Sequence, residues 1–253
     1  MKYGYNLFSA WETVQDRQSL ISMMKSLREL GYDGVEFFLY FDIPAAEMRD
    51  LTGEIGLTPF STHPRMARFF DHLDEEIDYA KTAGIETLVM PHVPDEDRNP
   101  AYYKRLLDAI PRWKKACDSA GLRLAWHNHE FEFEPWEDRR WLLDAILEAA
   151  PVDYEPDIFW TTFTQVDTLA LMERYKDRIR YVHFKDYKGA RGKSFADIDF
   201  CAVGEGLVDV KAAAQKAREI GAKWAVVEQD LHRRDVLEDA KISLQTLKKL
   251  FEG

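Results

Sequence analysis

The sequence is poor in cysteine and has no long apolar run. Its two cysteines, Cys117 and Cys201, form neither a metal-ligand pair nor a redox motif, which fits a reducing compartment. The apolar runs are far shorter than the roughly 20 residues of a membrane-spanning helix, and the first residues lack the apolar segment of a signal peptide. We therefore expect a cytoplasmic protein without a membrane partner.

Positive charge is also scarce. The chain has 34 Lys and Arg against 45 Asp and Glu, a formal net charge of −11, which would repel a phosphate backbone. We therefore expect no nucleic-acid partner. Apolar residues, in contrast, make up 46% of the 253 residues and suffice for a substantial core. No linker or low-complexity tract divides the chain, which predicts one domain over residues 1–253.

A helix, a glycine and a short apolar strand follow one another five times. The glycines are Gly31, Gly56, Gly84, Gly121 and Gly221, each placed as a left-handed helix cap. Strands are expected at residues 4–8, 34–38, 58–62, 87–91, 122–127, 152–158, 180–184 and 224–228, with helices such as 16–29, 74–83, 101–120 and 210–220 between them. This alternation predicts an α/β fold, a (β/α)8 TIM barrel. The irregular loop over residues 188–199 is expected to cover a site.

Polar side chains gather where these strands end. The run His127-Asn128-His129-Glu130-Phe131-Glu132 directly follows the fifth strand, although folding requires no such concentration of polar atoms. Other strand ends carry Glu36, His63, His92, Asp157, His183 and Glu228. Because the chemistry of such barrels lies at the carboxyl ends of the strands, these residues are expected to form one ring.

Part of this ring has the composition of a metal site. His127, Asp157, His183 and Glu228 belong to strands five to eight, which are contiguous in a barrel, so their side chains can converge. Imidazole and carboxylate ligands suit a divalent cation, with Mn²⁺ our first choice and Zn²⁺, Co²⁺ or Mg²⁺ as alternatives. Glu36, His63 and His92 would then face the substrate, and their polarity favours a multiply hydroxylated molecule.

The ordered motifs resemble the sugar phosphate isomerase/epimerase family, which has a xylose-isomerase-like barrel. The resemblance rests on the 127–133 run and on Asp157, His183-Phe184-Lys185-Asp186, Val203-Gly204-Glu205-Gly206 and Val227-Glu228-Gln229-Asp230. It implies a divalent metal, a small sugar substrate and ligand positions that match Asp157, His183 and Glu228. At strand five His127 stands where ketose 3-epimerases have glutamate, and carboxylates follow only at Glu130 and Glu132. The His-Asn-His form is nearer the inositol-dehydratase-like and keto-glycoside-acting branches.

The expected mechanism is metal-assisted proton abstraction next to a carbonyl, through an enediolate. Glu228 or Glu132 is the candidate base, and His129 or Lys185 is the candidate to return the proton. Return to carbon gives isomerisation or epimerisation, whereas transfer to a leaving hydroxyl gives dehydration or elimination. Trp160 could stack on the sugar or pack its own helix.

Each assignment has a structural alternative. His127 and His129 could be core histidines, Asp157 a helix cap, Glu228 an interior partner of arginine, and Lys185 with Glu132 an ion pair. Two other functional classes also remain: an endonuclease of the related barrel type and a sugar-binding barrel that has lost its metal. Phe69, Phe70 and Trp136 could mark a homo-oligomer contact or line the pocket.

Overall fold

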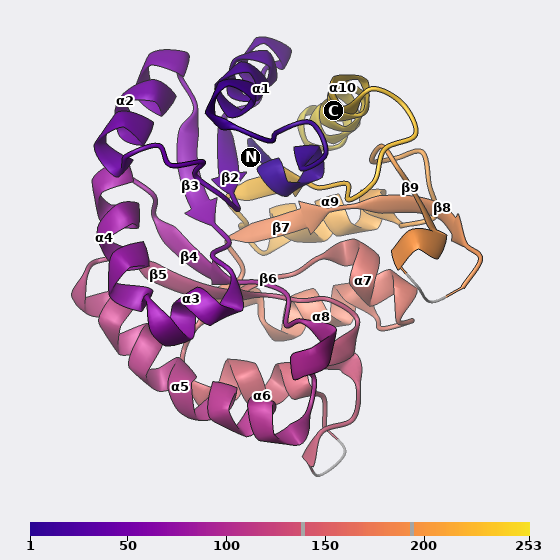
Figure 1. Cartoon of the computed structure of the whole chain (residues 1–253). Helices are drawn as coiled ribbons and strands as arrows, with labels where there is room; N and C mark the ends of the chain where they lie inside the picture. Colours follow the sequence, from indigo (N-terminus) through magenta and orange to yellow (C-terminus); the bar gives the residue numbers. More distant parts are fainter. Residues whose placement is uncertain (138–139, 193–194) are drawn as a thin grey trace.

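Eight parallel strands form a nearly closed barrel in the computed structural model, which describes residues 1–137, 140–192 and 195–253 (Figure 1). The strands are β1 Lys2–Asn6, β2 Gly34–Phe37, β3 Thr58–Thr62, β4 Thr87–Met90, β5 Arg123–His127, β6 Asp153–Glu155, β7 Tyr181–Phe184 and β10 Trp224–Val227. They pair in the order β6-β5-β4-β3-β2-β1-β10-β7. Single bridges, Tyr154 to Ile179 and Asp157 to His183, join the two ends of this sheet. The predicted (β/α)8 barrel is confirmed.

Helices surround the barrel and account for the amphipathic segments of the sequence (Figure 1). They are α1 Arg17–Leu30, α2 Ala45–Ile55, α3 Met66–Asp71, α4 Leu73–Ala83, α5 Pro100–Ser119, α6 Leu142–Ala149, α7 Ile158–Phe163, α8 Thr168–Arg174, α9 Val210–Glu219 and α10 Val236–Glu252. The Asp16 side chain caps α1 by accepting the N–H of Ser19, and Gly31 ends the helix at φ 101°. All five predicted joint glycines have positive φ, as expected for left-handed caps.

Aromatic side chains fill the amino-terminal half of the barrel. Phe60 stacks on Trp224 with ring centroids 4.2 Å apart and on Tyr181 at 5.5 Å. Gly4 leaves room for the Phe60 ring, because a Cβ at this position would lie 2.6 Å from it, and a Cβ on Gly34 would lie 2.4 Å from the carbonyl oxygen of Thr58. The amino-terminal half of the barrel is therefore a packed core, and the predicted ring of polar residues lies at the carboxyl-terminal end.

Some predicted boundaries were wrong. The first strand is Lys2–Asn6, because residues 7–10 turn into the 3-10 helix η1 (Leu7–Ala10), which Asn6 caps by accepting the N–H of Phe8. The sixth strand is only Asp153–Glu155, since Pro156 follows and α7 begins at Ile158. Within the predicted irregular loop 188–199, β8 (Asp186–Ala190) and β9 (Ile198–Cys201) pair as an antiparallel hairpin, and residues 193–194 lie outside the described residues.

Asp186 explains why the Val203-Gly204-Glu205-Gly206 motif accompanies the His183 motif. Its buried carboxylate accepts the backbone N–H groups of Gly204 at 2.9 Å, Gly206 at 3.0 Å and Val208 at 3.0 Å. A Cβ on Gly206 would lie 2.3 Å from Asp186 Oδ1, so the turn can wrap this carboxylate only with glycine there. The motif is a structural turn around the Asp186 carboxylate.

Two compositional predictions concern the helices and the cysteines. No helix in the described parts of the chain combines the length and the apolar character needed to cross a membrane. Cys117 and Cys201 are both buried free thiols, as predicted from their isolation in the sequence.

Candidate metal centre and active site

The four predicted metal ligands come together at the carboxyl-terminal end of the barrel. His127 is the last residue of β5, Asp157 precedes α7, His183 lies in β7 and Glu228 follows β10. One nitrogen or oxygen atom of each lies within 4.8 Å of those of the other three, and all four residues are buried. His183 Nδ1 is 2.7 Å from Glu228 Oε2, and His127 Nε2 is 3.9 Å from Asp157 Oδ2. We refer to these four residues as the ligand cluster.

Asp157 divides two functions between its oxygens. Oδ1 accepts the N–H of Phe159 at 2.8 Å and so caps α7, as the structural alternative predicted. Oδ2 is buried without a hydrogen bond of regular geometry, and Lys185 Nζ, which lies 3.1 Å away, is shared with the carboxylates of Glu228 and Asp230. A cation among two imidazoles and two carboxylates would satisfy this oxygen, and the donor set is one that Mn²⁺, Zn²⁺ and Co²⁺ accept. The residues therefore fit a divalent metal.

Glu155 is the main residue that the sequence analysis missed. It is buried, and its Oε2 lies 3.0 Å from His63 Nε2, 3.3 Å from His183 Nε2 and 3.4 Å from His127 Nδ1. In both His127 and His183, Glu155 therefore faces the ring nitrogen that is turned away from the ligand cluster. Carboxylates in this position fix the orientation and tautomer of metal-binding histidines. A signal existed in the sequence, because Glu155 lies two residues before Asp157, on the same face of the strand.

Glu36, like Glu155, lies behind the imidazoles, and it does not line the cavity, contrary to its predicted contact with substrate. We refer to Glu36 and Glu155 as the outer carboxylates. The Asn6 amide donates to Glu36 Oε1 at 2.9 Å, and the Ser61 hydroxyl donates to Oε2. The same carboxylate lies 2.9 Å from His183 Nε2 and 3.1 Å from His63 Nε2. Glu36 is fully buried and positions imidazoles, whereas His63 reaches the cavity.

The histidines fall into two electrostatic classes. Burial opposes protonation of His63 and His183, but the carboxylates of Glu36 and Glu155 outweigh it and raise the pKa of both, that of His63 to about 9. Burial lowers the pKa of His127, assisted by the charge of His183. Burial likewise lowers the pKa of His129, which is therefore neutral near pH 7. The site thus combines neutral imidazoles with imidazoles held against carboxylates.

Lys185 is an internal cation beside the ligand cluster. Its buried Nζ lies 3.1 Å from Asp157 Oδ2, 3.3 Å from Glu228 Oε2 and 3.0 Å from Asp230 Oδ2. Burial opposes its charge, but these carboxylates outweigh burial and raise the pKa of Lys185. The alternative of an ion pair between Lys185 and Glu132 was therefore wrong, because the partners of Lys185 are the three carboxylates at the site.

Glu132 lies away from the cavity. Its carboxylate accepts the indole N–H of Trp126 at 3.0 Å and the backbone N–H of His129 at 2.8 Å, and the residue is fully buried. Glu130 also stays outside the ligand cluster and pairs with Arg98 at 2.7 Å. Glu132 thus fixes the loop that carries His129, and it is not placed to act as the base.

The buried position of Glu132 predicts a pH dependence of stability. Burial raises the pKa of Glu132 to about 8 from an ordinary value of 4.5. The stabilisation from the protonated carboxyl is complete below pH 4.5 and is lost as the pH rises through 8. The unfolding free energy of the wild type relative to Glu132→Gln should fall across this window by up to about 1.4 kcal/mol per pH unit. Urea denaturation at several pH values measures this difference, and parallel curves for the two proteins would contradict the assignment.

A cavity of about 1260 Å³ opens above the ligand cluster at the carboxyl-terminal end of the barrel. His127 and Glu228 of the cluster line it, together with the predicted residues His63, His92, His129 and Trp160. Trp160 lies 5.6 Å from His129 between ring centroids, and its indole N–H is buried without a hydrogen bond. Phe70 lines the same cavity, whereas Phe69 is buried in the core and is not available for a homo-oligomer contact.

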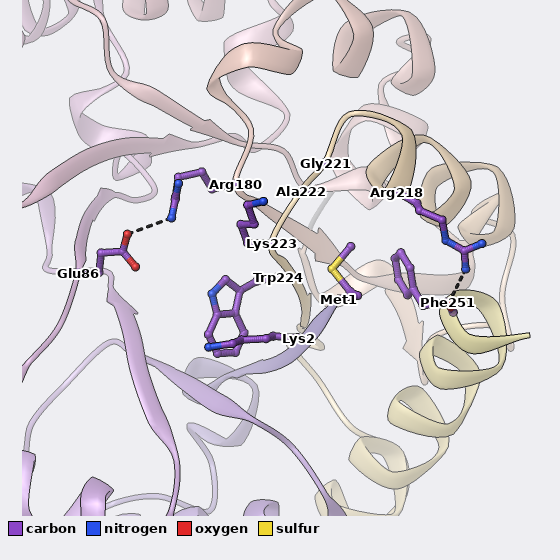
Figure 2. Close-up of a pocket in the computed structure, with 10 residues that line it drawn as sticks. All are labelled: Met1, Lys2, Glu86, Arg180, Arg218, Gly221, Ala222, Lys223, Trp224 and Phe251. Carbon is purple, nitrogen blue, oxygen red and sulfur yellow. Dashed lines mark hydrogen bonds and ion pairs between the residues drawn. The ribbon is translucent and has the colours of Figure 1, made fainter.

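A second cavity of about 560 Å³ lies at the opposite, amino-terminal end of the barrel (Figure 2). Three of its four cationic side chains have structural partners: Lys2 lies over the ring of Trp224, Arg180 pairs with Glu86 at 3.1 Å, and Arg218 donates to the Phe251 carbonyl near the end of α10. It has no imidazole in its lining. The cavity above the ligand cluster is therefore the candidate active site.

Comparison with known proteins agrees with this arrangement. Residues 24–250 match the family model of the xylose isomerase-like TIM barrel. The chain belongs to this family. The match covers most of the chain, including all four residues of the ligand cluster. No match was found among curated protein sequences.

Solved structures of this family share the fold at low sequence identity. A sugar phosphate isomerase/epimerase from Parabacteroides distasonis ATCC 8503 has a TM-score of 0.79 and 21% identity, over 99% of this chain and 93% of that one. An IOLI protein with a bound zinc atom has a TM-score of 0.76 and 15% identity, over 100% and 98%. An L-ribulose 3-epimerase has a TM-score of 0.77 and 15% identity, over 100% and 95%. The chain is therefore a member of the xylose isomerase-like TIM barrel family with a candidate metal site.

Proposed function

We propose that this xylose isomerase-like protein is a divalent-metal-dependent isomerase or epimerase that acts on a keto-sugar or keto-inositol by removing a proton next to a carbonyl. The observation that carries the proposal is the convergence of His127, Asp157, His183 and Glu228 within 4.8 Å beneath an open cavity. These four residues would hold the metal, with Mn²⁺ the first candidate. When bound, the cation would stabilise the negative charge that develops on the carbonyl oxygen.

Glu228 is the proposed base. It lines the cavity, and although burial opposes its ionisation, the charges of Lys185 and His183 outweigh burial and hold the pKa of Glu228 well below its usual range. It is therefore ionised near pH 7 and able to accept a proton. Lys185, 3.3 Å from Glu228, maintains this charge state.

His129 is the proposed partner in proton transfer. Its ring centroid lies 5.0 Å from that of His127, it lines the cavity, and burial keeps it neutral near pH 7. Its Nδ1 is buried without a hydrogen bond, so the imidazole is not committed to a structural role. His129 can therefore exchange a proton with a substrate oxygen or carbon.

A dehydratase or lyase acting on the same substrates is the second candidate. With Glu132 turned away, the wall of His92 and His129 offers imidazoles in place of a second glutamate, which suits protonation of a leaving hydroxyl. An endonuclease is less well supported, because Asp71, Asp95, Glu96 and Asp97 line the cavity and would repel a phosphate backbone.

Deuterium incorporation tests the proposal. The Mn²⁺-loaded full chain is incubated in D₂O with a panel of keto-sugars and keto-inositols, and exchange at carbon is scored by NMR. We expect exchange with at least one compound, loss on chelation, and a drop of about 100-fold or more in Glu228→Gln. A new alkene or dicarbonyl signal would identify the dehydratase.

Glu54→Gln provides the matched control, because Glu54 is an exposed residue of α2 outside the cavity lining. Its exchange rate should equal that of the wild type. Absence of exchange from the whole panel would refute the proposed reaction, and full exchange in Glu228→Gln would exclude Glu228 as the base.

A further inference from the structure

Four aromatic side chains form a continuous surface on one wall of the cavity. Phe8 and Trp11 follow β1, and Phe38 and Phe41 follow β2, its neighbour in the sheet. The Phe8 and Trp11 rings stack at 6.4 Å, Phe38 meets Phe8 edge-on at 5.6 Å, and Phe41 meets Phe38 edge-on at 6.3 Å. All four line the cavity. We call them the aromatic shelf.

The aromatic shelf is exposed and yet held in place. Phe8 is 37% exposed and Trp11 is 38% exposed, which is unusual for large apolar side chains. The indole N–H of Trp11 donates to the carbonyl of Asp230 at 3.0 Å, so the ring is fixed at the cavity. Phe41 adopts a left-handed conformation with φ 48°, which is rare for a bulky residue and persists only where the surroundings enforce it. Fixed, open rings of this kind are typical of a surface that stacks on a ligand.

The cavity is larger than a monosaccharide requires. Pockets that enclose drug-sized ligands measure roughly 300–1,000 Å³, and this cavity measures about 1260 Å³. The ligand cluster lies at its floor and the aromatic shelf lines one wall, so a sugar bound at the cluster leaves room for a further group. The remaining space therefore fits a second, apolar group attached to the sugar.

The charges around the cavity disfavour an anionic group in that space. Apart from Asp230 and Glu228 at the floor, the charged lining residues are the carboxylates Asp71, Asp95, Glu96, Asp97 and Glu130, the guanidinium groups Arg65, Arg98 and Arg105, and His63, which is held between Glu36 and Glu155. Arg98 is already paired with Glu130 and Asp95, and Arg105 lies over the ring of Phe70. A phosphate would meet an excess of negative charge, so a neutral ligand is favoured.

We propose that the substrate is a neutral keto-sugar that carries an aromatic aglycone, and that this aglycone stacks on the aromatic shelf while the keto-sugar reaches the ligand cluster. This inference rests on the proposed function for the position of the sugar. The aromatic shelf, the volume of the cavity and the charges of its lining carry the assignment of the aglycone.

Binding of simple probes tests the assignment without turnover. Calorimetric titration of the Mn²⁺-loaded full chain would compare methyl and phenyl glucosides of both anomers, cellobiose and glucose 6-phosphate. We expect a phenyl glucoside to bind about tenfold more tightly than the methyl glucoside of the same anomer. Phe8→Ala and Phe41→Asn should abolish this preference, and asparagine tolerates the left-handed conformation at residue 41. Thermal unfolding confirms that each variant is folded.

Leu207→Ala is the matched control, because Leu207 is an apolar residue, 63% exposed, outside the cavity lining. It should retain the phenyl preference. Equal affinity for phenyl and methyl glucosides, tighter binding of cellobiose or glucose 6-phosphate, or no binding of any probe would each overturn the aglycone assignment. Deuterium exchange with free keto-sugars would then still support the proposed reaction. A phenyl preference without exchange would support only the binding of an aromatic aglycone on the aromatic shelf.

Discussion

Replacement of Glu155 by alanine should lower the affinity of the protein for Mn²⁺ by about tenfold to a hundredfold, the effect typical of carboxylates behind metal-binding histidines. Glu155 Oε2 lies 3.4 Å from His127 Nδ1 and 3.3 Å from His183 Nε2, the ring nitrogens turned away from the ligand cluster. Without Glu155 the His127 ring loses its carboxylate at Nδ1, and His183 Nε2 keeps only that of Glu36. Calorimetric titration of Mn²⁺ into the chelator-treated full chain measures the change.

The same substitution should destabilise the protein, because it removes one of the two buried carboxylates that favour the protonated forms of His63 and His183. Complete loss of a buried ion-pair partner costs about 3–5 kcal/mol, and because Glu36 remains beside both rings we expect a smaller loss here. Glu155→Gln keeps the shape of the side chain and separates the two effects if the alanine variant does not fold. Glu86→Ala removes the same charge at the opposite end of the barrel and should leave Mn²⁺ affinity unchanged. Wild-type affinity in a folded Glu155→Ala protein would exclude the positioning role.

The repeated pattern of the chain predicts the barrel well, because helix caps and buried strands are local features. The predicted helices at 16–29, 74–83, 101–120 and 210–220 agree with α1, α4, α5 and α9 to within one residue at each end. The first strand was misplaced because Asn6 caps a 3-10 turn whose apolar residues look like a continuing strand. The β8–β9 hairpin was missed because glycines and polar residues in the 188–199 segment conceal its pairing.

The ligand cluster could be predicted because a barrel forces the carboxyl ends of neighbouring strands together. The roles of the buried carboxylates could not be predicted as readily, because they depend on which way each side chain points. Glu36 and Glu132 were expected at the substrate, yet both are fully buried and hold other groups, Glu36 through Asn6 and Ser61 and Glu132 through Trp126. A carboxylate near a strand end can thus face the cavity or the protein interior, and only the packing of its neighbours decides.

Asp157→Asn should separate the two functions of this residue. The amide oxygen can still accept the N–H of Phe159 and cap α7, but the charge at the position of Oδ2 is lost. We expect Mn²⁺ affinity to fall by more than about 100-fold, which exceeds the effect expected for Glu155, a residue behind the ligands. The helix cap should lose little of its stability. Asp157→Ala should lose the same affinity and an additional ~1 kcal/mol of stability from the cap.

Thermal unfolding with and without Mn²⁺ measures both quantities together. A ligand that binds only the folded state raises the melting temperature by an amount that grows with the ratio of its free concentration to its dissociation constant, so the wild type should gain stability with Mn²⁺ while both variants should not. Asp209→Ala, which removes the cap of α9 far from the ligand cluster, should lose cap stability and keep the Mn²⁺ response. A full Mn²⁺ response in Asp157→Asn would show that the carboxylate of Asp157 does not bind the metal, and the ligand cluster would then have to be assigned without it.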